Sequence, residues 1–97
     1  MDINYELYKV FYYVASTLSF SEASKQLFIS QSAVSQSIKA LEKKLDQTLF
    51  IRSTKKVRLT TEGEILLRHI EPAISLIKRG ESQLLDVGAR GGALLQI

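Results

Sequence analysis

The stretch that decides the fold is LSFSEASKQLFISQSAVSQSIK, residues 18–39. Ser21 can cap a short helix from Glu22 to about Phe28, because a serine hydroxyl accepts a hydrogen bond from an amide of the first helical turn. After a break at residues 29–30, a second helix begins near Gln31 or Ser32. Two short helices joined by a few residues are typical of a helix-turn-helix.

The second of these helices has one apolar and one polar face. Its apolar residues recur at spacings of four, three and four residues, at Val34, Ile38, Leu41 and Leu45. The other face carries Ser32, Ser35, Gln36 and Lys39. This periodicity predicts a helix that packs on a core and presents hydrogen-bonding groups outward.

Upstream, residues 4–18 predict another core-facing helix with Asn4 as its N-cap. Its apolar stripe consists of Leu7, Val10, Phe11, Val14, Ala15 and Leu18. The expected core also includes Phe20, Ala23, Leu27, Val34, Ile38, Leu41 and Phe50.

Downstream, residues 48–52 and 56–60 are β-prone runs on either side of Ser53-Thr54-Lys55, and they predict a hairpin. In the second run, Val57 and Leu59 alternate with Lys56, Arg58 and Thr60, so one face packs and the other meets solvent or phosphate. A basic hairpin that directly follows the second helix of a helix-turn-helix, the recognition helix, is called a wing.

Residues 61–87 predict a long helix that begins at a Thr60 or Thr61 cap. A heptad-like seam runs along it, interrupted by Glu81, with apolar members Leu67, Ile70, Ile74, Ile77 and Leu84. Because a domain of 60 residues is too small to cover this seam, we expect a second copy to bury it in a homodimer. Pro72 should bend or loosen the helix without breaking it. Residues 88–97 then predict a hinge and an apolar strand that starts a further domain.

Composition limits the chain to one small domain with an appendage, since it has 97 residues of which 45% are apolar. It has no cysteine and one histidine, which excludes disulfides and thiolate or histidine-rich metal sites. Neither a nucleophile–base pair nor a glycine-rich phosphate loop is present, so we expect no enzyme. No signal segment or membrane-spanning run is visible, and we expect a cytoplasmic protein without membrane contact.

The net charge of +3 is unevenly distributed. Residues 1–60 hold nine Lys and Arg against five Asp and Glu, a net charge of +4, whereas residues 61–97 hold four against five, a net charge of −1. A basic cluster between Lys39 and Arg58 attracts a phosphate backbone, although a solvated helix face can look the same.

The order of these motifs resembles the N-terminal domain of LysR-type transcriptional regulators. The resemblance rests on residues 18–24, 27–39, 41–42, 49–52 and 59–63 and covers roughly residues 5–65. It implies a mostly α winged helix-turn-helix over residues 1–60, a linker and dimerisation helix over 61–87, and the start of an effector-binding domain at 88–97. The family implies an antiparallel dimer, with tetramers in longer proteins. It implies no cofactor in this portion and a small-molecule effector for the domain that follows.

Three positions depart from the family pattern. Ser32 stands where a proline is usual, Gln36 where an arginine is common, and Asp46 where a glycine follows the recognition helix. Glutamine can bond adenine through N6 and N7, whereas arginine prefers guanine, so the base preference common in the family is not carried over to this chain at that step.

The resemblance assigns double-stranded DNA as the partner and two groups of contact residues. The base-reading group is Gln31, Ser32, Ala33, Ser35, Gln36 and Lys39; the wing group, for phosphates or the minor groove, is Arg52, Lys55, Lys56 and Arg58. Simpler roles remain open for several of them. Ser30 or Ser32 can be a helix cap, Gln36 and Lys39 can be solvated, the wing charges can protect a strand edge, and Arg52 can form an internal ion pair.

We therefore expect a sequence-specific transcription regulator that binds a roughly palindromic operator as a dimer. The alternatives are nonspecific DNA binding, which a specificity ratio discriminates, and a winged helix used for protein interaction, against which the basic clustering argues.

Overall fold

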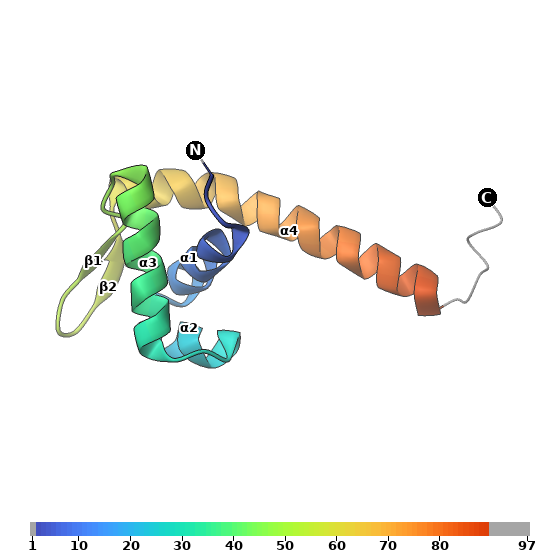
Figure 1. Ribbon diagram of the computed structural model, residues 1–97, viewed down its shortest axis with the longest axis horizontal. Helices are drawn as coiled ribbons and strands as arrows, with labels where there is room; N and C mark the ends of the chain where they lie inside the picture. Colours follow the sequence, from blue (N-terminus) through green and yellow to red (C-terminus); the bar gives the residue numbers. More distant parts are fainter. Residues whose placement is uncertain (1, 90–97) are drawn as a thin grey trace.

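The computed structural model describes residues 2–89. Along this part of the chain the elements are α1 (Tyr5–Thr17), α2 (Phe20–Leu27), α3 (Gln31–Leu45), β1 (Phe50–Arg52), β2 (Val57–Leu59) and α4 (Thr61–Ala89). The strands pair antiparallel beside α3, and α4 leads away from the other helices (Figure 1). The mostly α winged helix-turn-helix with a long final helix is confirmed.

The N-terminus of α2 differs from the prediction. Ser19, not Ser21, is the N-cap, and its side chain accepts a hydrogen bond from the amide of Glu22 at 3.0 Å. The helix starts early enough to carry Phe20 into the core, where that ring is 4% exposed. Core packing of Phe20 therefore decides between two serines that local chemistry leaves equivalent.

Single residues fix where α2 and α3 begin or end. Ser30 caps α3 by accepting from the amide of Ala33 at 3.1 Å, which leaves Ser32 exposed in the first turn. Phe28 and Asp46 follow α2 and α3 with φ values of 59° and 54°, in the left-handed region. A side chain with a Cβ is disfavoured there, so the glycine usual at position 46 has a backbone reason, and aspartate is among the better substitutes.

Three phenylalanines join the helices to the wing. The ring centroid of Phe50 lies 5.4 Å from that of Phe11 and 6.0 Å from that of Phe20. The rest of the buried cluster is aliphatic: Val10, Val14, Ala15, Ala23, Val34, Ile38, Leu41 and Leu49. Leu27 is only partly buried against this cluster.

The strands are shorter than predicted, because side chains satisfy the backbone at their outer ends. The carboxylate of Glu42 accepts from the amides of Leu49 and Phe50 at 2.7 and 3.3 Å. The hydroxyl of Thr60 donates to the carbonyl of Thr48 at 2.6 Å and accepts from the amide of Gly63 at 3.0 Å. Thr60 is thus the cap of α4, and the same side chain closes the wing.

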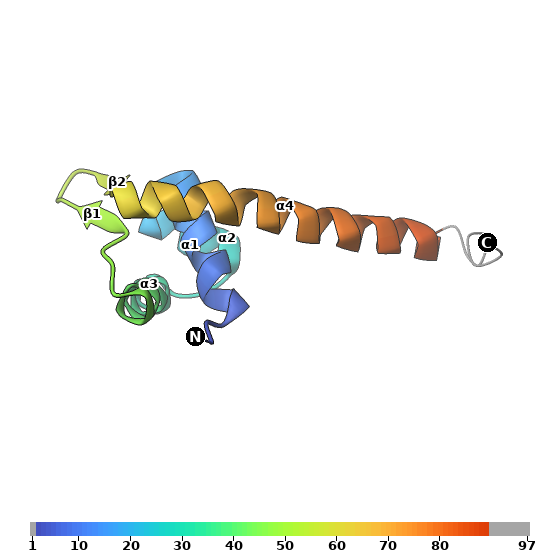
Figure 2. The ribbon, with the colours of Figure 1, turned by 90° about the horizontal axis from the view of Figure 1, so that it is seen from above.

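Helix α4 has two different halves. Leu67 and Ile70 pack against the core, and Ile74 is 2% exposed. Beyond them the helix projects from the domain (Figure 2), and Ile77 and Leu84 are 42% and 74% exposed. The expectation that a second copy is needed to bury all five seam residues is therefore wrong for Ile74, because α4 crosses α1 of its own chain before it projects. Leu67 and Ile70 are partly buried by the same crossing.

The long helix continues through Pro72 and ends at Ala89, two residues after the predicted Val87. At 1.5 Å per residue its 29 residues span roughly 43 Å. Gly88 and Ala89, predicted to open a hinge, are helical, and the strand predicted to follow lies outside the described residues. Within residues 2–89, α4 and the other helices lack the length of apolar sequence needed to cross a membrane.

Gly63 is required where α4 starts against the wing. A Cβ at this position would overlap the carbonyl oxygen of Leu49 and lie 2.8 Å from Cδ2 of Leu59. We expect Gly63→Ala to lower the free energy of unfolding by about 1–3 kcal/mol, the usual range for overpacking. Gly88→Ala is the control, because a Cβ there meets nothing within 4 Å. Urea unfolding at equal protein concentration measures both variants, and equal stability of the two would show that the backbone relaxes freely at Gly63.

Candidate nucleic-acid interface

The outward face of α3 holds the six predicted base-reading residues. Gln31, Ser32, Gln36 and Lys39 are exposed, while Ala33 and Ser35 are half-buried. On the opposite face Val34, Ile38 and Leu41 are no more than 3% exposed. Burial of that face fixes the rotation of the helix, so the polar side chains form one surface.

The wing ends in a tight turn from Ser53 to Lys56. The amide of Ser53 donates to the carbonyl of Lys56 at 2.8 Å, and the amide of Lys56 donates to the hydroxyl of Ser53 at 3.1 Å. Lys55 lies at the tip between them, and both lysines are exposed. Arg58 is exposed on β2, whereas the neighbouring Val57 and Leu59 face the core as predicted. The tip therefore presents cations with nothing packed over them in the described part of the chain.

An open cleft of about 520 Å³ separates the wing from the helix-turn-helix. Its lining joins residues 18–21 at the start of α2, Gln31 at the start of α3, and residues 52–57 of the wing. Ser19, Ser21 and Thr54 on this cleft were not identified from the sequence. A signal was available for Ser19 and Ser21, since a helix N-terminus carries amides and a partial positive charge that favour an anion.

Arg52 is held by other side chains of the domain. Its guanidinium carbon lies 3.8 Å from the ring centroid of Phe20, and Nη1 donates to the hydroxyl oxygen of Ser35 at 3.3 Å. The alternative of an internal ion pair is therefore not what the described residues show. Phe20 is buried as predicted, and one face of its ring supports this arginine.

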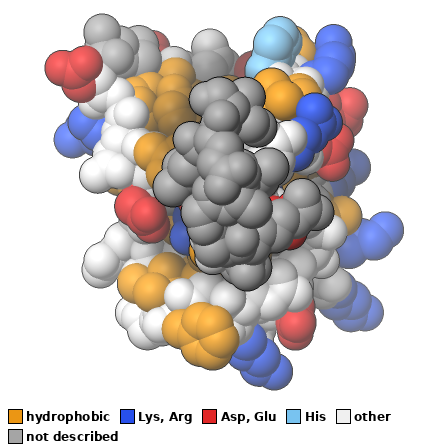
Figure 3. Space-filling view, turned by 90° about the vertical axis from the view of Figure 1, so that its right-hand side faces the viewer, with side chains coloured by type: hydrophobic (Ala, Val, Ile, Leu, Met, Phe, Trp, Pro, Cys, Tyr) orange, Lys and Arg blue, Asp and Glu red, His pale blue; other side chains and the backbone are white. Residues whose placement is uncertain are grey.

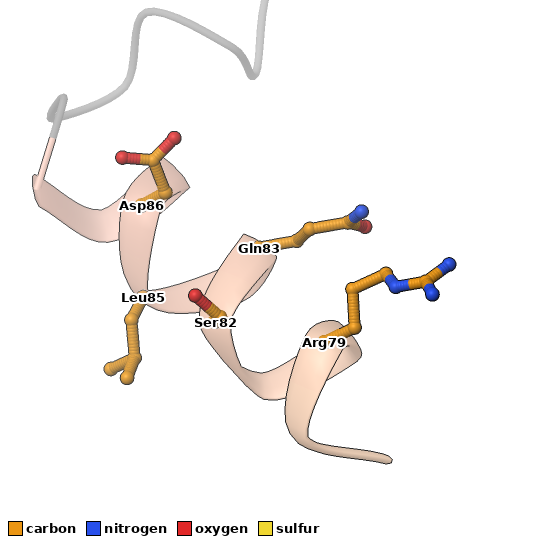
Figure 4. Close-up of a pocket in the computed structure, with 5 residues that line it drawn as sticks. All are labelled: Arg79, Ser82, Gln83, Leu85 and Asp86. Atoms are coloured by element: carbon orange, nitrogen blue, oxygen red, sulfur yellow. The ribbon is translucent and has the colours of Figure 1, made fainter. Parts of the chain in front are cut away.

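Two further hollows lie on α4. One, of about 380 Å³, is an apolar groove between the end of α3 and the first turns of α4, lined by Leu45, Gln47, Leu49, Glu62, Ile65, Leu66 and His69. The other is formed by α4 alone, from Arg79, Ser82, Gln83, Leu85 and Asp86 (Figure 4). No second element of the described chain closes over it, so it does not form an enclosed ligand site. Across residues 2–89, no three His, Asp or Glu side chains gather as metal ligands.

Comparison with known proteins agrees with this geometry. A family described as bacterial regulatory helix-turn-helix protein, lysR family, matches residues 5–64. The HTH-type transcriptional regulator PerR of Escherichia coli K12 is 42% identical over 74 residues, covering 76% of this chain and 25% of that protein. A probable RuBisCO transcriptional regulator of Emiliania huxleyi is 45% identical over 68 residues, covering 70% of this chain and 21% of that protein. The chain thus spans about a quarter of the length of such relatives.

Solved structures share the same fold. A DNA complex of the CbnR DNA-binding domain superposes with a TM-score of 0.74 at 26% identity and covers 89% of this chain and 99% of its own. The oxidised form of OxyR from Corynebacterium glutamicum superposes with a TM-score of 0.81 at 31% identity, over 87% of this chain and 27% of its own. A BenM DNA-binding domain in complex with DNA has a TM-score of 0.79 at 24% identity, which speaks for the fold alone.

The family match covers more than half of the chain and includes the recognition helix, the wing and the start of α4. The chain therefore belongs to the LysR family of helix-turn-helix transcription regulators, which are not enzymes, and it is a DNA-binding domain of that family.

Proposed function

We propose that this domain recognises a specific, roughly palindromic operator as a homodimer in the cytoplasm, with α3 in the major groove and the wing on the flanking backbone. The observation that carries the proposal is the single outward face of α3, where side chains able to bond base edges stand beside a cationic wing tip. The CbnR DNA-binding domain, which shares this fold, is solved in complex with DNA, and this supports DNA as the partner. In a longer protein this domain would be the DNA-reading part next to a small-molecule effector domain.

Base reading and phosphate contact fall to different elements in this proposal. Gln36 is exposed in the middle of the polar face of α3 and can bond adenine N6 and N7 together. Lys55 and Lys56 stand at the end of the hairpin and meet phosphates, which carry no sequence information by themselves. Specificity then comes from α3, and much of the affinity comes from the wing.

Dimerisation is proposed through the projecting half of α4. A stripe with spacings of four and three residues runs along α4 through Leu66, Ile70, Ala73, Ile77, Gly80 and Leu84. Its first two members, Leu66 and Ile70, also pack partly against their own domain. Its distal members Ile77 and Leu84 are exposed. Figure 3 shows the molecule from the end toward which α4 projects, with patches of hydrophobic side chains among charged and polar ones. An apolar stripe of this length is too large to leave in water on a stable monomer.

The same stripe defines a register. In an antiparallel pairing whose two-fold axis passes the helix at the level of Ser75, Ala73 lies opposite Ile77 of the partner subunit and Leu66 opposite Leu84 of the partner subunit. Ser75 itself is on the other side of the helix. Leu66 lines the apolar groove between α3 and α4, so this register supplies a leucine to fill that groove. Two-fold symmetry of such a pair would present two recognition helices to a palindromic site.

We expect Gln36→Ala to weaken binding to the selected operator by about 1–3 kcal/mol and to change binding to random duplex little, because only the base-specific bond is lost. Operator sequences are first selected from a random duplex pool, and titrations then compare both DNAs. Gln47→Ala, which removes an exposed glutamine beyond the end of α3, is the control. Equal losses on both DNAs would mean that Gln36 reads no base.

We expect Lys55→Ala combined with Lys56→Ala to lower the slope of log affinity against log salt by about two per protomer, since each contact to duplex DNA contributes roughly 0.9. Operator and random duplex should weaken alike. Lys43→Ala combined with Lys44→Ala removes the same charge from the last turn of α3 and should change the slope less. A slope that stays constant while only operator binding falls would indicate minor-groove reading instead.

We expect Ile77→Asp combined with Leu84→Asp to convert the protein to monomers in sedimentation equilibrium, because two charges would be buried at the proposed helix pair. Ile70 is left intact, since it packs on its own core and its loss would confuse dissociation with unfolding. Ser75→Asp combined with Ser82→Asp places the same charges on the opposite face and should leave the dimer intact. Dimers of unchanged stability in the first variant would exclude this interface.

A further inference from the structure

We infer that Arg52 is a positioning residue, which fixes the wing against the recognition helix and orients the hydroxyl of Ser35 as a hydrogen-bond donor toward DNA. The inference rests on the proposed mode of DNA binding and gives Arg52 a role different from the phosphate contact expected for it. It is carried by two contacts that join three elements: β1 to α2 through the Phe20 ring, and β1 to α3 through Ser35.

The first contact holds the wing. Arg52 is the last residue of β1 and precedes the turn that carries the two lysines. The Cζ atom of its guanidinium lies over the Phe20 ring, 3.8 Å from the ring centroid, and the compact ammonium of a lysine does not reproduce the stacking that a planar guanidinium can make there. Since Phe20 is 4% exposed and packs on Phe50, the support beneath the arginine is rigid. The direction of the wing tip is therefore set by this stack.

The second contact determines what Ser35 can offer to a base. A guanidinium has only donors, so the 3.3 Å bond from Nη1 uses Ser35 Oγ as an acceptor. The hydroxyl hydrogen of Ser35 stays free to point outward. In the major groove this donor matches N7 of a purine, O6 of guanine or O4 of thymine, and it does not match the N4 amino group of cytosine. Arg52 would thus narrow the base choice at this step without touching DNA.

A phosphate contact and a positioning role predict different double-mutant results. If Arg52 positions the wing, the loss caused by Lys55→Ala with Lys56→Ala should be at least about threefold smaller in an Arg52→Ala background than in the wild type, because neighbours in one network are coupled. Arg52→Lys should weaken operator binding about as much as Arg52→Ala, although the charge is kept. If Arg52 instead contacts a phosphate, the losses add, Arg52→Lys binds almost normally, and Arg52→Ala lowers the salt slope by roughly 0.9.

Two other variants keep the test independent of folding defects. Phe20→Leu retains an apolar core side chain and removes the ring beneath the guanidinium, so it should reproduce the loss of wing contribution with Arg52 still present. In an Arg52→Ala background the same substitution should add little further loss, whereas a loss that acts through Phe50 would persist there. Arg58→Ala removes a charge from the facing strand and should instead give an additive loss. Thermal unfolding of each free protein checks that the fold survives. If a folded Phe20→Leu protein loses as much DNA affinity on Lys55→Ala with Lys56→Ala as the wild type does, the inference is overturned.

The donor role of Ser35 has its own measurement. The operator position that faces Ser35 is identified as the one at which Ser35→Ala loses its base preference. A 7-deazapurine is then placed at that position, because it lacks the N7 acceptor. The wild type should lose affinity on the modified operator, whereas Arg52→Ala should lose little more. A wild type that binds random duplex as tightly as any selected sequence would remove the proposed specificity itself, but the coupling between Arg52 and the wing lysines would still be measurable on random duplex.

Discussion

The contact on which the rest of the domain depends is the packing of Phe50 between Phe11 and Phe20. Each aromatic pair contributes only about 0.5–1.5 kcal/mol beyond its buried area, but these two pairs tie the first strand of the wing to α1 and α2. Without that anchor a strand of three residues has too little pairing to hold its own position. A DNA-binding surface that combines a helix and a hairpin needs such a fixed joint.

Polar contacts complete the joint where apolar packing ends. Glu42 on α3 accepts from two amides at the start of β1, and Thr60 closes the end of β2 while it caps α4. These side chains satisfy backbone groups that a short two-stranded sheet leaves without partners. The recognition helix, the wing and the long helix are consequently linked at two connections, from α3 to β1 and from β2 to α4, so that a displacement of one of these elements displaces the others.

The surface of the DNA-binding end and the surface of the far half of α4 differ in polarity, and each suits a different kind of partner. The α3 face and the wing tip are polar or cationic, which suits a hydrated, negatively charged duplex. The far half of α4 leaves Leu76, Ile77, Leu84 and Leu85 exposed, which suits a partner that excludes water. Ile74 is still buried against its own domain, and the exposed apolar side chains of the far half of α4 begin directly after it.

Periodicity in the sequence was enough to predict every helix, the hairpin and the outward face of α3, because one buried face per element is a local property. Three features depended on the tertiary structure. Core packing of Phe20 selected Ser19 over Ser21 as the cap of α2. The crossing of α4 over α1 buried Ile74 and partly buried Leu67 and Ile70, which the seam alone had assigned to a second copy. The partners of Arg52, which lies on β1, are Ser35 on α3 and Phe20 on α2, 17 or more positions away in the sequence. The family resemblance implied a DNA contact for this arginine and left an internal ion pair open, but only the fold brought it over Phe20 and beside Ser35. Contacts between distant segments are set by how the elements pack and not by the pattern within any one of them.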